Sequence, residues 1–206
     1  MNKHSLQVAV VGMMKTNCYI LSNTETKETI IVDPGDQGDR IAEFCLKEGL
    51  RPKGILLTHG HFDHVGAVEK IVKETGCALW MSQRDWSQKP NFLTARLYPL
   101  ANCDFTEVQF CEDGEGIAAA GLTFTAIETP GHTWGSVCYL CGDAMFSGDT
   151  LFAGSCGRTD LPGGDWDTIA ESLKRLAALE SNYTVYPGHG DSTTLSAERQ
   201  YNPYMR

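Results

Sequence analysis

The stretch THGHFDHVGA, Thr58 to Ala67, decides the fold of this 206-residue chain. It places three of the six histidines and an aspartate within six residues, at His59, His61, Asp63 and His64. A strand pattern, GILLT, precedes these side chains and a helical pattern, VGAVEKIVKETG, follows them, so they are expected in the turn between. In an extended turn, residues two apart face the same way. His59 and His61 are therefore expected to hold one cation, and the other two side chains to reach a second.

Two cations need more ligands than four side chains provide, and three further residues of ligand type follow predicted strands. They are His132 in TPGHT, Asp149 in FSGDT and His189 in YPGHG. Each of these histidines alone would be interpreted as a loop residue that caps a turn. Together with the cluster at 59–64, they predict a metal centre, and only His4 among the histidines has no role.

Strand and helix patterns follow one another without a linker, charge run or low-complexity segment. Apolar alternation predicts strands over 6–11, 18–22, 29–33, 54–58, 122–128, 137–140, 144–147 and 183–186. Apolar residues at helical spacing predict helices that end at Gly49 and Gly76, and a third over 166–179. Two strand-rich sets with helices outside them predict one α/β domain over residues 1–206, built as a layered sandwich.

Composition excludes several classes of function. A net charge of −9, with no run of lysines or arginines, argues against a nucleic-acid partner. No apolar run approaches the roughly 18 to 20 residues of a membrane span, so a soluble, cytoplasmic protein is expected. Eight cysteines are scattered through a chain long enough to fold without disulfides, so reduced thiols are expected.

Other motifs in the sequence do not predict a second catalytic device. Cys138 and Cys141 in SVCYLCGD lie three apart in a strand pattern, so they face opposite ways and cannot share a metal. The segment GEGIAA at 114–119 is followed by a strand pattern rather than the helix of a dinucleotide site, which favours a hairpin. The chain also lacks G-x-S-x-G and a Walker A loop.

The combined motifs resemble the metallo-β-lactamase fold superfamily. HGHFDH, His132, Asp149 and His189 follow the order and spacing of that family. The loop DTLFAGSCGRTDLPGGD and the closing YPGHGDSTTLSAERQYNP are most similar to small bacterial glyoxalase II-like (hydroxyacylglutathione hydrolase-like) hydrolases. The resemblance extends from about Asn17 to Pro203 and implies a four-layer αββα sandwich, with metals at one edge of two sheets.

The resemblance also implies a role for each ligand-type side chain. The first metal would be bound by His59, His61 and His132, the second by Asp63, His64 and His189, and Asp149 would bridge them. Two divalent ions, two aspartates and a bridging hydroxide sum to a net charge of +1, which attracts an anionic substrate and stabilises an oxyanion. Because such ions lower the pKa of bound water toward about 7, attack by a metal-bound hydroxide is the implied reaction. Imidazoles and carboxylates suit zinc, iron and manganese alike, with zinc the first expectation.

A small anionic thioester of the S-lactoylglutathione type is the implied substrate. Larger glyoxalase II enzymes carry a helical domain that helps to bind glutathione, and the sequence ends soon after His189 without it. Arg158, in the loop after Asp149, is a candidate anchor for the thiol conjugate, and the alternative is a surface arginine with a structural partner. Trp134 stands where such hydrolases usually have proline. Asp33 in VDPG is expected either to orient a ligand histidine or to be a plain turn residue.

Rival functions remain open within the same resemblance. Persulfide dioxygenases share the fold and a similar GCGRTD-like loop but use one iron, so the complete second ligand set favours the dinuclear hydrolase. Another esterase or lactonase of this fold is a further alternative. A non-catalytic metal-binding module would be expected to lack a ligand, and none is missing. The sequence does not indicate an oligomeric state.

Overall fold

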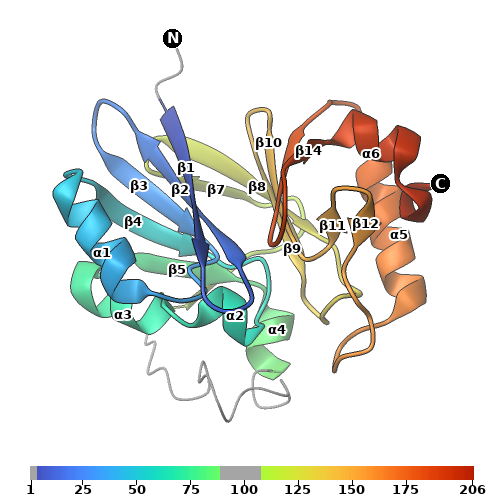
Figure 1. The fold of residues 1–206 in the computed structure, drawn as a ribbon, viewed down its shortest axis with the longest axis horizontal. Coiled ribbons are helices and arrows are strands. Elements are labelled where there is room, and N and C mark those ends of the chain that lie inside the picture. Colours follow the sequence, from blue (N-terminus) through green and yellow to red (C-terminus); the bar gives the residue numbers. More distant parts are fainter. Residues whose placement is uncertain (1–3, 89–107) are drawn as a thin grey trace.

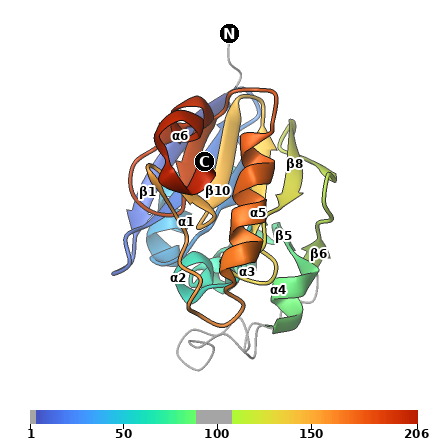
Figure 2. The same cartoon turned by 90° about the vertical axis from the view of Figure 1, so that its right-hand side faces the viewer.

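The computed structural model describes residues 4–88 and 108–206. Two six-stranded sheets face each other, and helices cover the outer face of each sheet (Figure 1). The view turned by 90° shows the C-terminal helices lying across the second sheet (Figure 2). This four-layer αββα arrangement confirms the fold class that the sequence predicted.

The first sheet has the strand order β1-β2-β3-β4-β5-β6. Its strands are β1 (His4–Val11), β2 (Thr16–Asn23), β3 (Glu28–Val32), β4 (Arg51–Leu56), β5 (Ala78–Met81) and β6 (Val108–Phe110). The first three pair antiparallel, and β3 to β6 pair parallel. Parallel neighbours require crossover connections. Helices α1 (Gly38–Lys47) and α3 (Val68–Thr75) lie in the first two crossovers and pack on the same outer face (Figure 1).

The second sheet has the order β14-β13-β10-β9-β8-β7. Its strands are β7 (Gly116–Ala119), β8 (Leu122–Glu128), β9 (Val137–Cys141), β10 (Ala144–Gly148), β13 (Thr184–Pro187) and β14 (Thr193–Thr194). Only β10 and β13 pair parallel, and α5 (Trp166–Ala177) lies in the crossover between them. The short pair β11 (Leu151–Phe152) and β12 (Ser155–Cys156) and helix α6 (Leu195–Tyr201) complete this half.

Three apolar clusters hold the layers together. Successive strand residues point to opposite faces. In β3, Ile31 therefore packs with Ile41 of α1, whereas Ile30 packs with Phe124 and Phe146 of the other sheet. A third cluster lies between the second sheet and helices α5 and α6. The sandwich therefore has one apolar layer between its sheets and one under each set of helices.

Most predicted segments correspond to observed ones, with ends that differ by at most three residues. The exception bears on the ligands: the predicted extended turn contains a short helix, α2 (Phe62–Val65), which carries Asp63 and His64. The prediction was wrong there because one helical turn has no repeating apolar pattern. Helices α4 (Gln83–Gln88) and α6 were not predicted, nor were strands β5, β6, β11, β12 and β14.

The two rejected motifs behave as the sequence analysis expected. Cys138 packs in the cluster under α5 and α6, while Cys141 packs in the cluster between the sheets, so the pair faces opposite ways. Residues 116–119 pair antiparallel with 122–125 as a hairpin.

Seven cysteines are free thiols, and Cys103 lies outside the described residues. In the described ranges, no helix has the length and apolar character needed to cross a bilayer.

Candidate metal centre

The seven predicted ligands come together from four chain segments, each of which follows a strand. Residues 59–64 follow β4, and the other three side chains follow strands of the second sheet: His132 after β8, Asp149 after β10 and His189 after β13. A backbone hydrogen bond connects the two halves of the sandwich nearby: the amide of Val137, at the start of β9, donates to the carbonyl of Thr58, just after β4. Ligand-type side chains more than a hundred residues apart are therefore neighbours.

Three imidazoles form the first group: His59, His61 and His132. One ring nitrogen from each lies within 4.8 Å of the others. Nε2 of His132 is 2.9 Å from Nδ1 of His61, and the ring of His59 stands edge-on to both at centroid distances of 4.8 and 4.9 Å. This is the set that the family resemblance implied for the first ion.

Asp63, His64 and His189 form the second group, and their donor atoms also lie within 4.8 Å of one another. Oδ2 of Asp63 is 3.3 Å from Nε2 of His189 and 3.6 Å from Nε2 of His64. The helix α2 turns the side chains of residues 63 and 64 toward this group. The sequence analysis proposed the same three residues, but from an extended segment.

Asp149 lies between the two groups. Its Oδ1 is 3.4 Å from Nε2 of His64, and its Oδ2 is 3.5 Å from Nε2 of His189 and 3.6 Å from Nε2 of His132. One carboxylate therefore reaches an imidazole of each group, which is the geometry that a bridging ligand requires.

A buried carboxylate, Asp33, orients two of the imidazoles. Its Oδ2 accepts hydrogen bonds from His64 Nδ1 at 3.0 Å and from the Thr58 hydroxyl at 2.6 Å. Because the Thr58 hydroxyl donates its proton to Asp33, its oxygen accepts a hydrogen bond from His59 Nδ1 at 3.0 Å. Asp33 has a φ of +49°, a strained conformation for a residue with a side chain. Of the two expectations for Asp33, the structure favours the orienting role.

These partners leave the other ring nitrogens facing the centre. His132 likewise donates from Nδ1 to the carbonyl oxygen of Arg158 at 2.8 Å, which leaves Nε2 as an acceptor. Among the described residues, four buried side-chain polar atoms have no hydrogen-bond partner, and three belong to this centre: His59 Nε2, His64 Nε2 and Asp149 Oδ1. Buried polar atoms are normally paired. Imidazole nitrogens and a carboxylate oxygen that converge without hydrogen-bond partners fit divalent metal ions as ligands.

The charges divide the two groups. Burial, followed by repulsion from His132, lowers the pKa of His61 to about 3. Burial likewise lowers the pKa values of His59 and His132, so the first group is neutral and keeps its lone pairs. Burial opposes protonation of His64 as well, but Asp149 and Asp33 raise its pKa to about 9. Without a metal, a proton on this imidazole balances the neighbouring carboxylates of Asp149 and Asp33.

The start of β2 holds the second group, and the sequence analysis assigned it no role. The Thr16 hydroxyl donates to Asp63 Oδ2 at 3.0 Å. Asn17 Nδ2 donates to the carbonyl oxygens of Pro187 and Gly190, on either side of His189. Polar side chains in an otherwise apolar, fully buried strand were the available signal.

Arg158 lies close to the centre, but its side chain points to a different partner. Its guanidinium is exposed and forms a two-point ion pair with Asp160, at 2.6 and 2.7 Å. Trp134 packs over Gly163 and lines a hollow with residues of α4. The backbone of residue 158 therefore orients a candidate ligand histidine, while Nε and Nη2 of its side chain bind Asp160.

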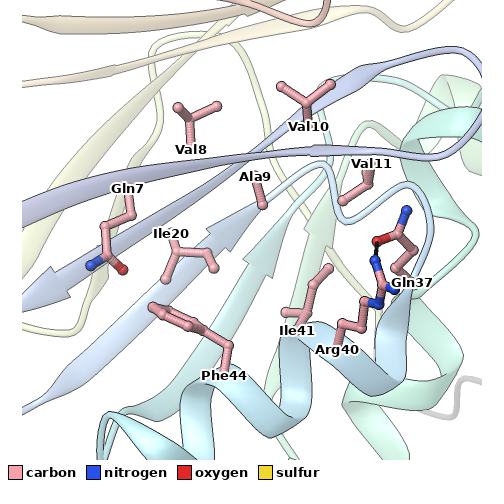
Figure 3. Close-up of a pocket in the computed structure, with 10 residues that line it drawn as sticks. All are labelled: Gln7, Val8, Ala9, Val10, Val11, Ile20, Gln37, Arg40, Ile41 and Phe44. Atoms are coloured by element: carbon pink, nitrogen blue, oxygen red, sulfur yellow. Dashed lines mark hydrogen bonds between the residues drawn. The ribbon is translucent and has the colours of Figure 1, made fainter.

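A cavity in the described part of the chain lies away from these side chains. It measures about 460 Å³ and opens between β1 and α1, where Ile41 and Phe44 point toward Ile20 (Figure 3). None of its lining residues is a candidate ligand. This cavity is therefore separate from the metal centre.

Comparison with known proteins agrees with this geometry. A family model described as the metallo-beta-lactamase superfamily matches residues 11–189. The chain belongs to the metallo-beta-lactamase superfamily. Superfamily members with similar sequences include the hydroxyacylglutathione hydrolase GloC of Haemophilus influenzae, which is 32% identical over 98% of each chain.

Two similar solved structures cover nearly the whole chain. The BLEG-1 B3 metallo-beta-lactamase has a TM-score of 0.86 and 33% identity, covering 98% of this chain and 99% of its own. TTHA1623 in a di-iron-bound form has a TM-score of 0.83 and 37% identity, covering 96% and 99%. Membership in this superfamily supports a metal-dependent hydrolase, and the identities of the ion and substrate need further argument.

Proposed function

We propose that this chain is a dinuclear metal-dependent hydrolase of small anionic thioesters of the S-lactoylglutathione type. The observation that carries the proposal is the position of Asp149, within 3.6 Å of imidazole nitrogens from both complete donor groups. The relative from Haemophilus influenzae, named as a hydroxyacylglutathione hydrolase, supports the choice of thioester.

Two divalent ions held there would polarise a thioester carbonyl and provide a nucleophilic water at neutral pH, because they lower the pKa of bound water toward about 7. The residues of the chain set the charge of the centre. His59, His61 and His132 are neutral as candidate metal ligands. The only negative side chains among the seven are Asp63 and Asp149. A centre that is left with net positive charge attracts an anionic substrate and stabilises a developing oxyanion.

The ligand chemistry suits zinc and iron alike. Five imidazoles and two carboxylates contain no thiolate that would demand a soft ion. We keep zinc as the proposed ion, and the di-iron form of TTHA1623 makes iron the direct competitor. Elemental analysis of protein purified from its native host separates them.

The decisive experiment combines metal analysis with a substrate screen. We expect close to two ions per chain, and hydrolysis of S-lactoylglutathione without oxygen uptake in an oxygen electrode. The screen includes lactone, β-lactam and phosphodiester substrates. Glu198→Gln is a matched control that should keep both ions. Glu198 is a buried carboxylate that contacts Gly154, Thr193 and Asn202 rather than a candidate ligand.

Two results would contradict the proposal. One iron per chain, unchanged in His189→Ala, would show that the second group binds no ion. Oxygen uptake with glutathione persulfide, while S-lactoylglutathione stays intact, would establish the one-iron dioxygenase instead.

A further inference from the structure

A second buried carboxylate, Asp85 on α4, contacts both loops that carry the three-histidine group. Its side chain has no exposed surface and accepts three hydrogen bonds. The donors are the backbone amide of Gly60 at 2.9 Å, the backbone amide of Gly135 at 2.6 Å and the hydroxyl of Thr133 at 2.8 Å. Helix α4 contributes none of the seven candidate ligands, so this carboxylate acts only through its neighbours.

The three donors surround the ligands in sequence. Gly60 stands between His59 and His61, and Thr133 directly follows His132. One carboxylate thus connects the two loops that supply all three imidazoles of the first group. Because hydrogen bonds to a carboxylate are short and directional, it sets the distance between these loops.

The approach of the second loop to α4 depends on a glycine. A Cβ at Gly135 would lie 2.4 Å from the Ser82 hydroxyl and 2.7 Å from the backbone nitrogen of Asp85. The loop therefore reaches the carboxylate only because residue 135 has no side chain. The bond of 2.6 Å from its amide is the shortest of the three.

The second group is held by other contacts. Asp33 accepts from His64, Thr16 donates to Asp63, and Asn17 binds the carbonyls on either side of His189. The three bonds of Asp85 go to neighbours of the first group alone. Removing the carboxylate should therefore affect the two groups unequally.

Burial of this carboxylate is costly, and its three donors offset only part of the cost. Burial raises the pKa of Asp85 to about 6, while the bonds from Thr133, Gly60 and Gly135 act in the opposite direction. A carboxylate kept in such a place, with two backbone amides and a hydroxyl as its hydrogen-bond donors, indicates a use for its acceptor oxygens.

We propose that Asp85 is a positioning residue that sets the affinity of the His59, His61 and His132 group for its metal ion. The inference rests on the proposed metal-dependent function, but not on the identity of the substrate. Groups that orient ligand imidazoles typically contribute about 10- to 100-fold to metal affinity.

The test measures zinc affinity of each group separately, by competition with a coloured chelator and without substrate. His189→Ala weakens the second group, so zinc binding in that background measures the affinity of the first group. His61→Ala weakens the first group, so zinc binding there measures the affinity of the second. Asp85→Asn is then added to each background. We expect zinc binding to weaken by about 10- to 100-fold in the His189→Ala background. In the His61→Ala background we expect the zinc affinities with and without Asp85→Asn to agree within about twofold.

Glu198→Gln is the matched control for loss of a buried carboxylate. Glu198 is 4% exposed and also accepts three hydrogen bonds, and it should leave zinc affinity unchanged in both backgrounds. Thermal unfolding of the metal-free variants measures the purely structural cost. Lower thermal stability with unchanged zinc affinity in the His189→Ala background would overturn the proposal, as would an equal loss in both backgrounds.

Thr133→Val provides a second test if Asp85→Asn fails to fold. It keeps the shape of the residue and removes one of the three donors. Weaker zinc binding confined to the His189→Ala background supports the role of Asp85, and unchanged binding there overturns it. Because no substrate is used, a chain that hydrolyses no thioester can still pass or fail this test, so the two proposals fail separately.

Discussion

Replacing Gly188 with alanine would place a methyl group inside the metal centre. A Cβ built at this residue would lie 2.2 Å from Asp149 Oδ1 and 2.7 Å from His64 Cε1. Gly188 is not among the residues with positive φ, so the backbone itself would accept alanine. The whole effect of the substitution should therefore come from the displaced ligands.

The structure sets the size of this displacement. A carbon and a carboxylate oxygen in contact need about 3.2 Å, so the Asp149 carboxylate would have to move by about 1 Å, a misplacement that typically costs about 100-fold in rate. Backbone hydrogen bonds restrict the alternative, movement of residue 188: its amide donates to Gly148, and its carbonyl accepts from Asn17 at 2.7 Å. We expect fewer than two ions per chain and a fall in kcat of about 100-fold.

The assay is elemental analysis together with steady-state hydrolysis of S-lactoylglutathione. Gly116→Ala is the control, because its Cβ would meet no atom closer than Thr123 Cγ2 at 3.8 Å. Thermal unfolding of both variants verifies that they fold. Two ions per chain and a kcat within about threefold of the parent for Gly188→Ala would refute the proposed position of Asp149 between the metal ions.

Three further predictions concern the same centre. Asp149→Asn removes a charge and a ligand shared by both groups, so kcat should fall by at least about 100-fold, and near-normal kcat with normal metal content would contradict the bridging role. Arg158→Met should raise KM for an anionic thioester with little change in kcat, and Asp160→Asn, which frees the guanidinium from its ion pair, should lower KM; equal KM values in all three proteins would make Arg158 structural. In the metal-free protein, burial opposes the charge on His64, but Asp149 and Asp33 raise its pKa from 6.5 to about 9. Its stabilising contribution is therefore complete below about pH 6.5 and is lost as pH rises through about 9, so the Tm should fall over that window, whereas a constant Tm would show that this charge does not stabilise the fold.

The order of elements and the family could be predicted from the sequence, because both depend on local patterns. Apolar alternation located β1 to β4 and β8 to β10, and the HGHFDH motif identified the superfamily. Helix α2 escaped prediction because a single turn has no repeating period. The ligand roles stay predictions until metal is measured, although the structure brings the same residues together in the predicted groups.

The sequence by itself determined which side chains of ligand type exist and which strand each follows, because residue type and spacing are local properties of the chain. Only the tertiary structure decided what orients them. Asp33 is 25 residues from Thr58, Thr16 is 47 residues from Asp63, and Asp85 is 50 residues from Gly135. The same holds for Arg158, whose side chain was a candidate either for binding substrate or for a structural partner and whose carbonyl orients His132. A polar side chain in a strand or helix shows its chemistry in the sequence, but its partner depends on packing of distant segments, which no local pattern encodes.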